Sequence, residues 1–467
     1  MHYTEEVEPE SLPIRKWDMW SKWVLFLLLG LSLTGRSFSY LGIPPAKLFI
    51  GDLTLAAFIF LRPRQLFDPW IKALTKGGGL GPLAWILLIS ISYGIFQVIR
   101  GVLLGFTPII AVENLVFNVY PLYLFLGLWL GKRRPELLLR FVQVFAVLFC
   151  IYAPAYLLVL HTILVKMPGS DGVNVFGQAA GGGFIILSLL CLDPKPGRWW
   201  PAMVVAAAAL LAVQVRSEWL GMIVATMIWG VLSRKMTKVA MIGAGIFAVL
   251  AVGALADVNL PSPGERGGKI STTEIVARGV AAVSPDMARD LTGSENVNFY
   301  SGTIKWRKMW WHAIWVNSQE NFTNLLIGPG YGFPLKNLVS YLRDPDLRTP
   351  HNVFYYALGY TGWIGVLIFF SLQAGCGVLL WRTYKVTGQS WGLAVWASGL
   401  TAAFFGNVME TPWGAIPFYL MTGLFVAPHL AAIGSPARAQ SRSVPSSIAY
   451  PAQGEYAREG AYTSEAI

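Results

Sequence analysis

The feature that most constrains this 467-residue chain is a series of long apolar runs separated by short polar connections. Hydrophobic residues make up 55% of the chain and charged residues only 13%, which is unlike the composition of soluble domains. A bilayer core about 30 Å thick needs about 20 apolar residues per helix, and a helix satisfies its backbone hydrogen bonds internally. The runs therefore predict an all-α polytopic membrane protein.

About twelve of the runs are candidate transmembrane helices. The first run is short, and the seventh and eighth are separated by only a tight turn around Arg216. The predicted spans lie at residues 22–35, 46–62, 80–99, 112–131, 137–160, 176–192, 199–215, 217–233, 238–256, 352–381, 391–408 and 412–433.

Basic residues alternate between the two sets of connections. If the N-terminus is cytoplasmic, the inner connections hold most of the lysines and arginines, as the positive-inside rule requires. The outer connections before residue 257 hold few: Arg36, Arg100, Lys166 and Arg216. This topology accounts for the net charge of +11, so we expect no nucleic-acid partner. It also places the longest polar segment, residues 257–350, on the outer face.

The domain organisation follows from the spans. We expect a cytoplasmic N-terminal segment, nine spans, one large and partly helical outer loop, three further spans and a disordered cytoplasmic tail. Their boundaries are 1–21, 22–256, 257–350, 351–433 and 434–467. A loop between spans nine and ten makes the two halves unequal, which counts against transporters built from matched repeats.

The three cysteines, Cys150, Cys191 and Cys376, all fall inside apolar runs. Such positions are typical of packing, and the spacing fits neither a disulfide framework nor a metal finger. The sequence therefore predicts no metal site and no cofactor.

Arg216 is a cation at the outer end of two apolar runs. An arginine at a membrane boundary needs a partner, because unpaired charge there is costly. It either reaches the interface or pairs with Glu218, or it contacts an anion, because its planar guanidinium fits phosphate oxygens in pairs. The sequence leaves these interpretations open.

Residues 301–311 in the loop place three positive charges among three tryptophans, at Lys305, Trp306, Arg307, Lys308, Trp310 and Trp311. A basic and aromatic helix of this kind lies in the headgroup layer, or it covers a site for a sugar linked to a lipid diphosphate. In the second case the indoles stack on sugar rings and Arg307 reaches phosphate. Further on, glycines at 328, 330 and 332 allow a tight turn that exposes amide groups.

His351 closes the loop at the start of a span, three residues after Arg348. A neutral imidazole accepts a proton from a hydroxyl near pH 7, which suits a general base. A capping or structural histidine is the alternative. The start of a helix also presents backbone N–H groups to an anion.

In this combination the sequence resembles the bacterial O-antigen ligase and O-antigen polymerase superfamily. The matching pieces occur in the order Arg216-Ser217, Trp306-Arg307 with Trp310, Gly328-Pro329-Gly330-Tyr331-Gly332, Arg348-Thr349-Pro350-His351-Asn352 and Gly359-Tyr360-Thr361-Gly362. They cover about residues 200–370, and the rest resembles the family in topology alone.

The resemblance implies a metal-independent glycosyltransferase of the bacterial inner membrane with its active site on the periplasmic face. It implies an undecaprenyl-diphosphate-linked glycan as donor, and lipid A core or another lipid-linked glycan as acceptor, for lipopolysaccharide or surface polysaccharide assembly. Carried over, Arg216 and Arg307 contact the diphosphate, Arg348 is a further candidate, and His351 is the base. The alternatives are an O-antigen or exopolysaccharide polymerase and, in another class, a non-catalytic lipid or polysaccharide carrier.

Overall fold

A computed structural model of the chain describes residues 18–43, 48–165, 173–174, 176–177, 181–213, 215–256, 260–261, 269–280, 284–292, 294–339 and 349–430. Helices account for nearly all of these residues. The described strands form three two-residue antiparallel pairs: β1 (Gly42–Ile43) with β2 (Leu48–Phe49), β3 (Leu164–Val165) with β4 (Val173–Asn174), and β5 (Leu260–Pro261) with β6 (Lys269–Ile270). The all-α class is thus confirmed.

The helices of the first half of the chain cover the first six predicted apolar segments and the connections between them. They are α1 (Met19–Thr34), α2 (Arg36–Ser39), α3 (Ile50–Leu61), α4 (Pro63–Lys76), α5 (Gly81–Leu103), α6 (Pro108–Val119), α7 (Tyr123–Arg133), α8 (Leu137–Leu158) and α9 (Gly182–Leu192), with 3-10 turns η2 (Gly78–Leu80), η3 (Tyr120–Leu122) and η4 (Leu160–Thr162).

The helices of the second half include those of the predicted outer loop. They are α10 (Trp200–Val213), α11 (Arg216–Leu232), α12 (Met236–Leu255), α13 (Thr272–Val280), α14 (Pro285–Thr292), α15 (Ser294–Gln319), α16 (Phe322–Ile327), α17 (Val353–Thr387), α18 (Trp391–Phe405) and α19 (Pro412–Val426), with 3-10 turns η5 (Pro196–Trp199), η6 (Leu335–Leu338) and η7 (Ala427–His429).

Every predicted apolar run contains a helix, and the chain is a multi-pass membrane protein. Within the described residues, six helical segments are long and apolar enough to cross a bilayer: Gly78–Leu103, Pro108–Arg133, Leu137–Leu158, Pro196–Val213, Met236–Leu255 and Val353–Thr387. The other six runs carry helices of 11 to 17 residues, in α1, α3, α9, α11, α18 and α19. The count of twelve spans therefore stays a prediction.

The connection after residue 62 is more ordered than a polar linker. It forms α4, which begins with a proline at its first position and buries Leu66, Trp70 and Ala73. The indole N–H of Trp70 donates to the carbonyl of Ala84 at 3.0 Å, so α4 is held against α5. The helix exposes its polar face, which explains why hydropathy alone leaves it out of the spans.

Small residues let the helices of the core approach closely. A Cβ placed on Gly127 of α7 would lie 2.2 Å from the carbonyl oxygen of Leu420 in α19. A Cβ on Gly423 of α19 would lie 2.1 Å from the carbonyl oxygen of Leu124. In lipid, where apolar burial contributes little to helix association, such close backbone packing holds helices together.

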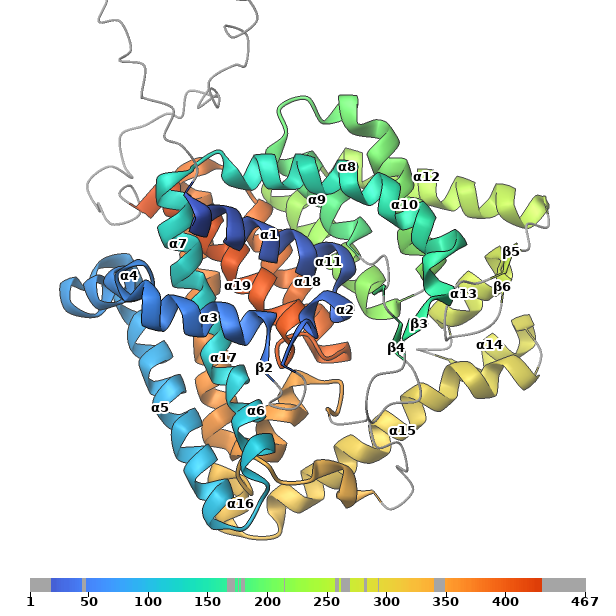
Figure 1. Cartoon of the computed structure of the whole chain (residues 1–467). Helices are drawn as coiled ribbons and strands as arrows, with labels where there is room; N and C mark the ends of the chain where they lie inside the picture. Colours follow the sequence, from blue (N-terminus) through green and yellow to red (C-terminus); the bar gives the residue numbers. More distant parts are fainter. Residues whose placement is uncertain are drawn as a thin grey trace, which may run out of the picture.

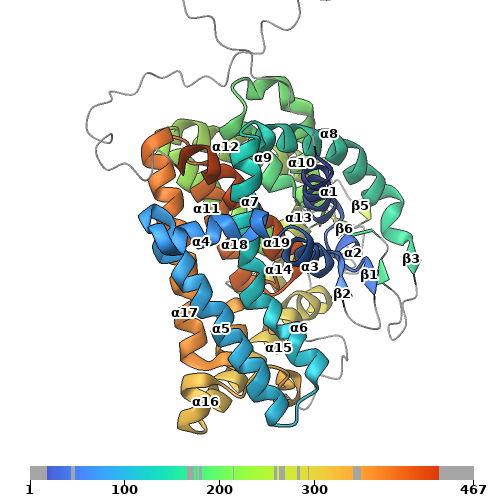
Figure 2. The ribbon, with the colours of Figure 1, turned by 60° about the vertical axis from the view of Figure 1, so that its left-hand side comes forward.

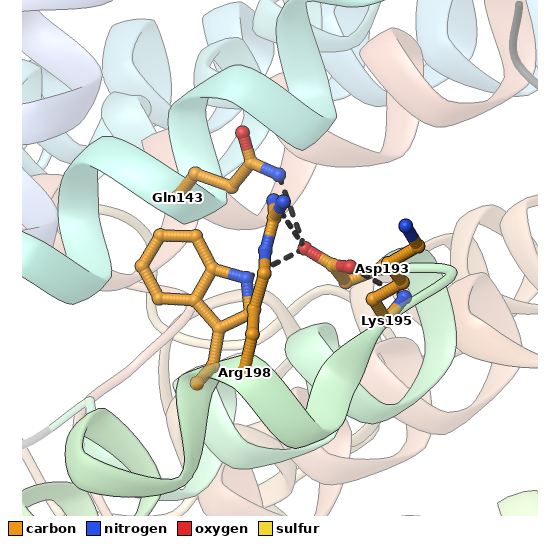
Figure 3. Close-up of polar contacts among 5 residues, drawn as sticks. Gln143, Asp193, Lys195 and Arg198 are labelled. Atoms are coloured by element: carbon orange, nitrogen blue, oxygen red, sulfur yellow. Dashed lines mark hydrogen bonds and ion pairs between the residues drawn. The ribbon is translucent and has the colours of Figure 1, made fainter. Parts of the chain in front are cut away.

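Asp193 fixes the corner between α9 and α10 (Figure 3). Its Oδ2 accepts hydrogen bonds from Gln143 at 3.1 Å, Arg198 at 3.2 Å and Trp199 at 2.7 Å, and its Oδ1 accepts from the backbone N–H of Lys195 at 2.8 Å. Burial opposes ionisation, but these donors outweigh it and hold the pKa of Asp193 below its ordinary value. A buried carboxylate that is fully hydrogen-bonded ties α8 to the corner.

The long helices α5 and α17 lie side by side in both views, with α16 at their lower end and α15 reaching that end obliquely from α14 (Figures 1 and 2). Helices α13 to α16 therefore make up most of the described part of residues 257–350. They carry Arg307 on α15 to the N-terminal end of α17, where His351 lies.

Candidate functional site

The C-terminal end of α18 is the point where the predicted site segments meet. The carbonyl of Phe404 accepts a hydrogen bond from Asn352 Nδ2 at 2.9 Å, and the carbonyl of Phe405 accepts one from an Arg307 guanidinium nitrogen at 3.0 Å. A Cβ placed on Gly406 would lie 4.0 Å from Ser217 Oγ. Three successive residues thus contact three segments that are far apart in the sequence.

Arg216 is the first residue of α11 and is half-buried. Helix α11 packs along α18, where a Cβ on Gly221 would lie 2.8 Å from Ser398 Oγ. The same packing brings Ser217, the neighbour of Arg216, next to Gly406 at the end of α18. The N-terminal end of α11 therefore lies beside the end of α18 that Arg307 contacts.

Trp306 contacts both of the other predicted groups. The Cζ of Arg307 lies 5.4 Å from the centre of the Trp306 ring, within the range of a cation–π contact. The imidazole of His351 lies 5.7 Å from the same ring at an angle of 72°, an edge-to-face arrangement. The indole links a guanidinium on α15 with the imidazole before α17.

The backbone around His351 is held from both sides. His351 has φ +52°, a left-handed conformation that is uncommon for residues other than glycine. Asn352 caps α17, because its Oδ1 accepts from the backbone N–H groups of Phe354 at 2.9 Å and Tyr355 at 3.2 Å. On the other side, the indole N–H of Trp311 donates to the carbonyl of Pro350 at 2.7 Å.

Arg348, the remaining predicted contact, lies outside the described residues, so its place relative to the site is still a prediction. Of the four candidates, the structure describes Arg216, Arg307 and His351. It connects all three to the end of α18, directly or through the adjacent residue.

The glycine-rich turn at residues 328–332 is a packing element. Its φ values are +68° at Gly328, +103° at Gly330 and +88° at Gly332. The amides that the sequence suggested were exposed are used inside the protein: Gly330 N–H donates to Tyr360 O at 3.0 Å, Tyr331 N–H to Gln97 O at 3.3 Å and Gly332 N–H to Asn114 Oδ1 at 3.0 Å. The turn fills the space between α5, α6 and α17.

Glu410, in the loop between α18 and α19, is a candidate that sequence reasoning missed. Its side chain is buried, and within the described part of the chain neither carboxylate oxygen has a hydrogen-bond partner. Burial raises the pKa of Glu410 to about 8, so most of the carboxyl is protonated at neutral pH. A lone acid between two apolar runs is the same kind of signal that pointed to Arg216.

A buried polar network lies near Glu410. Glu410 is within electrostatic range of Tyr356, whose hydroxyl accepts a hydrogen bond from Asn114 Nδ2 at 3.0 Å. One turn further along α6, Asn118 donates to Ser90 Oγ at 3.0 Å and accepts from the Tyr331 hydroxyl. Hydrogen-bonded groups in an apolar interior hold helices in a single arrangement, so this network fixes α17 against α5 and α6.

The arrangement has the groups that a transfer from a diphosphate needs. It holds two guanidinium groups, a type that fits phosphate oxygens in pairs, an imidazole, a type that can accept a proton near pH 7, and an aromatic ring beside Arg307 and His351. Arg216 begins α11 and Arg307 lies in the middle of α15, so both guanidinium groups are carried by helices rather than by long loops, which keeps their geometry defined.

The comparison with known families matches this part of the chain. Residues 201–370 match the family model described as O-antigen ligase. The matched segment contains the three described site residues, Arg216, Arg307 and His351. A search of curated proteins finds no match.

Proposed function

Because residues 201–370 match the family model described as O-antigen ligase, we propose that the chain is a membrane glycosyltransferase that moves a glycan from undecaprenyl diphosphate to an acceptor hydroxyl. The acceptor is a sugar of lipid A core, and the product is a lipopolysaccharide or a related surface polysaccharide. Transfer takes place on the periplasmic side of the bacterial inner membrane. The positive-inside rule supports this side. Most lysines and arginines before residue 257 lie in the connections predicted to be cytoplasmic, and the same topology puts the segment with Arg307 and His351 on the opposite side of the membrane.

The observation that carries the proposal is the convergence at the end of α18. Phe404 and Phe405 bond to Asn352 and Arg307, and Gly406 lies next to Ser217. A diphosphate held there is within reach of cationic groups from two elements. Because the donor is a dianionic lipid, two arginines from different helices bind it more specifically than one flexible lysine does.

In the proposed step, His351 takes the proton of the acceptor hydroxyl. The acceptor oxygen attacks the anomeric carbon of the donor sugar, the bond from that carbon to the phosphate oxygen breaks, and undecaprenyl diphosphate leaves with the electron pair. Arg216 and Arg307 stabilise the negative charge that develops on the leaving diphosphate. Arg348 is proposed as a further diphosphate contact.

The test is transfer in vitro with purified protein, a synthetic undecaprenyl-diphosphate glycan and lipid A core. We expect His351→Ala to reduce kcat by about 10²- to 10⁴-fold, the range for a lost general base. Arg216→Ala and Arg307→Ala should each cost about 10²- to 10³-fold, as does removing one donor to a developing oxyanion. Lys305→Ala is the matched control, since Lys305 is exposed on α15 two residues before Arg307. Full activity of the His351 and arginine variants would refute the site.

Metal independence is tested in the same assay. Within the described part of the chain, no three His, Cys, Asp or Glu side chains gather as a metal site requires. We expect undiminished transfer after treatment with EDTA, with no gain on adding Mg²⁺ or Mn²⁺. Loss of transfer in EDTA that returns with a divalent ion would contradict the mechanism.

The choice of acceptor separates the ligase from a polymerase. Supplying a second lipid-linked repeat unit in place of lipid A core tests the O-antigen or exopolysaccharide polymerase. A carrier without chemistry would form no product with either acceptor and would move the lipid-linked glycan equally well with His351→Ala.

A further inference from the structure

A second feature lies along α15, next to the site described above. It is a hollow of about 400 Å³ lined by Lys308, Trp311, His312, Trp315 and Tyr355. This volume is within the range of small-ligand sites, which is about 300–1,000 Å³. We call these five residues the α15 hollow.

We propose that the α15 hollow is the subsite that holds a sugar ring of the acceptor glycan. This inference rests on the proposed function and names the place where that reaction's second substrate is recognised.

The walls of the hollow are mainly aromatic. Trp311 and Tyr355 stack at 5.3 Å between ring centres with only 9° between their planes. Trp315 adds a third ring, which is 37% exposed and contacts Trp363 edge to face. Flat aromatic faces suit the C–H faces of pyranose rings, which are apolar, while the sugar hydroxyls point outward to polar groups.

Two polar side chains also line the hollow. Lys308 and His312 lie four residues apart on α15, so both project from one face of the helix. Both are exposed. Their N–H groups can donate to sugar hydroxyls, and the ammonium also attracts acidic or phosphorylated sugars. These two polar side chains favour a ligand that carries hydroxyl or phosphate groups over a bare acyl chain.

The hollow lies close to the proposed base, His351. The indole N–H of Trp311 is already bonded to the carbonyl of Pro350, the residue before His351. Tyr355 lies four residues after His351, about one helical turn into α17. A ring bound in the hollow is therefore next to the proposed base, where an acceptor hydroxyl has to be. Trp311 is held in place before any sugar binds, which lowers the entropic cost of binding.

The test measures acceptor recognition separately from chemistry. In transfer assays, we expect Trp315→Ala and His312→Ala to raise KM for lipid A core by about tenfold, with KM for the donor and kcat changed less than about threefold. Met309→Ala and Val316→Ala are the matched controls. Both residues are exposed on α15 next to the hollow without lining it.

Binding is measured independently with a soluble core oligosaccharide, by saturation-transfer NMR on full-length protein in detergent. The wild type should transfer magnetisation to the sugar ring protons, and Trp315→Ala and His312→Ala should abolish this signal. His312 is exposed, so its variant keeps the test valid if Trp315→Ala fails to fold.

Two results overturn the inference. One is active transfer with acceptor KM unchanged in both variants. The other is an unchanged oligosaccharide signal together with loss of co-purified phospholipid in native mass spectrometry, which would make the hollow a lipid site. A wild type that binds the oligosaccharide but forms no product would instead contradict the proposed function and leave the subsite supported.

Discussion

At the scale of single residues, His351 combines a proposed chemical role with backbone strain. Among the described residues, only Arg234 and His351 have positive φ without being glycine. A left-handed residue with a Cβ costs about 1–2 kcal/mol. The Asn352 cap and the Trp311 bond to Pro350 are the contacts that hold His351 in this conformation. Such strain is common at functional sites, where it points a side chain in a particular direction.

Replacing His351 with glycine should separate strain from chemistry. Glycine adopts φ +52° without steric strain, and this relief offsets the entropic cost of glycine and the lost contact with Trp306, so we expect His351→Gly to have a Tm close to that of the wild type. Transfer should nevertheless fall by about 10²-fold or more because the base is gone. Arg234→Gly, at the turn after α11, is the control: its Tm should also stay close to that of the wild type, and it should keep full activity. A clear fall in the Tm of His351→Gly would show that the imidazole stabilises the fold.

Glu410 predicts how stability depends on pH. The pKa of Glu410 is about 8 in the folded state, against an ordinary value of 4.5. Between these two pH values the folded state holds a proton that the unfolded state has released. Stability should therefore fall as pH rises from about 4.5 to 8, at about 1.4 kcal/mol for each unit by which the two pKa values differ. Glu410→Gln keeps the shape of the neutral acid and removes this loss.

The measurement is Tm between pH 6 and pH 8.5 in one detergent. We expect the wild type to lose more stability than Glu410→Gln over this range, and the variant to be the more stable protein at the alkaline end. Parallel curves for the two proteins would mean that Glu410 is ionised in the folded state at neutral pH.

At the level of secondary-structure elements, the kink in α17 packs directly against the glycine-rich turn. Gly362 interrupts α17 with φ +60° and ψ −167°, and a Cβ there would lie 2.5 Å from the carbonyl oxygen of Leu326. A Cβ on Gly328 would lie 2.5 Å from the carbonyl oxygen of Tyr360. The Tyr93 hydroxyl donates to Thr361 O at 2.7 Å and fixes the kink to α5. Both glycines belong to the motifs that resemble the family, and the structure gives them a packing reason.

Gly362→Ala should therefore be strongly destabilising. The combination of φ +60° and ψ −167° is essentially restricted to glycine and costs other residues about 1–3 kcal/mol, and the clash with the Leu326 carbonyl adds to this cost. We expect a large fall in Tm and a low yield of monodisperse protein in size-exclusion chromatography. Gly243→Ala in α12 is the matched control, since a Cβ there meets nothing within 4 Å, and its Tm should not fall. Equal behaviour of the two variants would refute the steric account of the kink.

At the scale of the whole molecule, the main prediction is topology. In a background without the three native cysteines, Lys305→Cys should react with an impermeant maleimide in right-side-out vesicles. Lys76→Cys and Lys385→Cys should react only after the membrane is permeabilised. All three lysines are exposed in the fold, so accessibility reports the side of the membrane. Reaction of Lys76→Cys before permeabilisation would show that the predicted orientation or the predicted number of spans is wrong.

Sequence reasoning reached the architecture because apolar length is a local property. Each run of apolar residues has to become a helix when water is absent, whatever its neighbours are. The same argument missed α4, whose apolar face is narrow, and it could not count the spans, since α9 has only 11 residues. Helix lengths of this kind depend on how the bilayer and the neighbouring helices accommodate them.

The sequence by itself determined that the chain is a helical membrane protein, and it pointed to Arg216, Arg307 and His351 as residues that need a chemical explanation. A charge or a histidine at the end of an apolar run is visible without a structure, because its desolvation cost is a property of the residue. Only the tertiary structure brought these residues to the end of α18, assigned the turn amides to packing, and revealed Glu410 and the α15 hollow. Those features arise from contacts between segments far apart in the chain, and no local pattern encodes the distance between them.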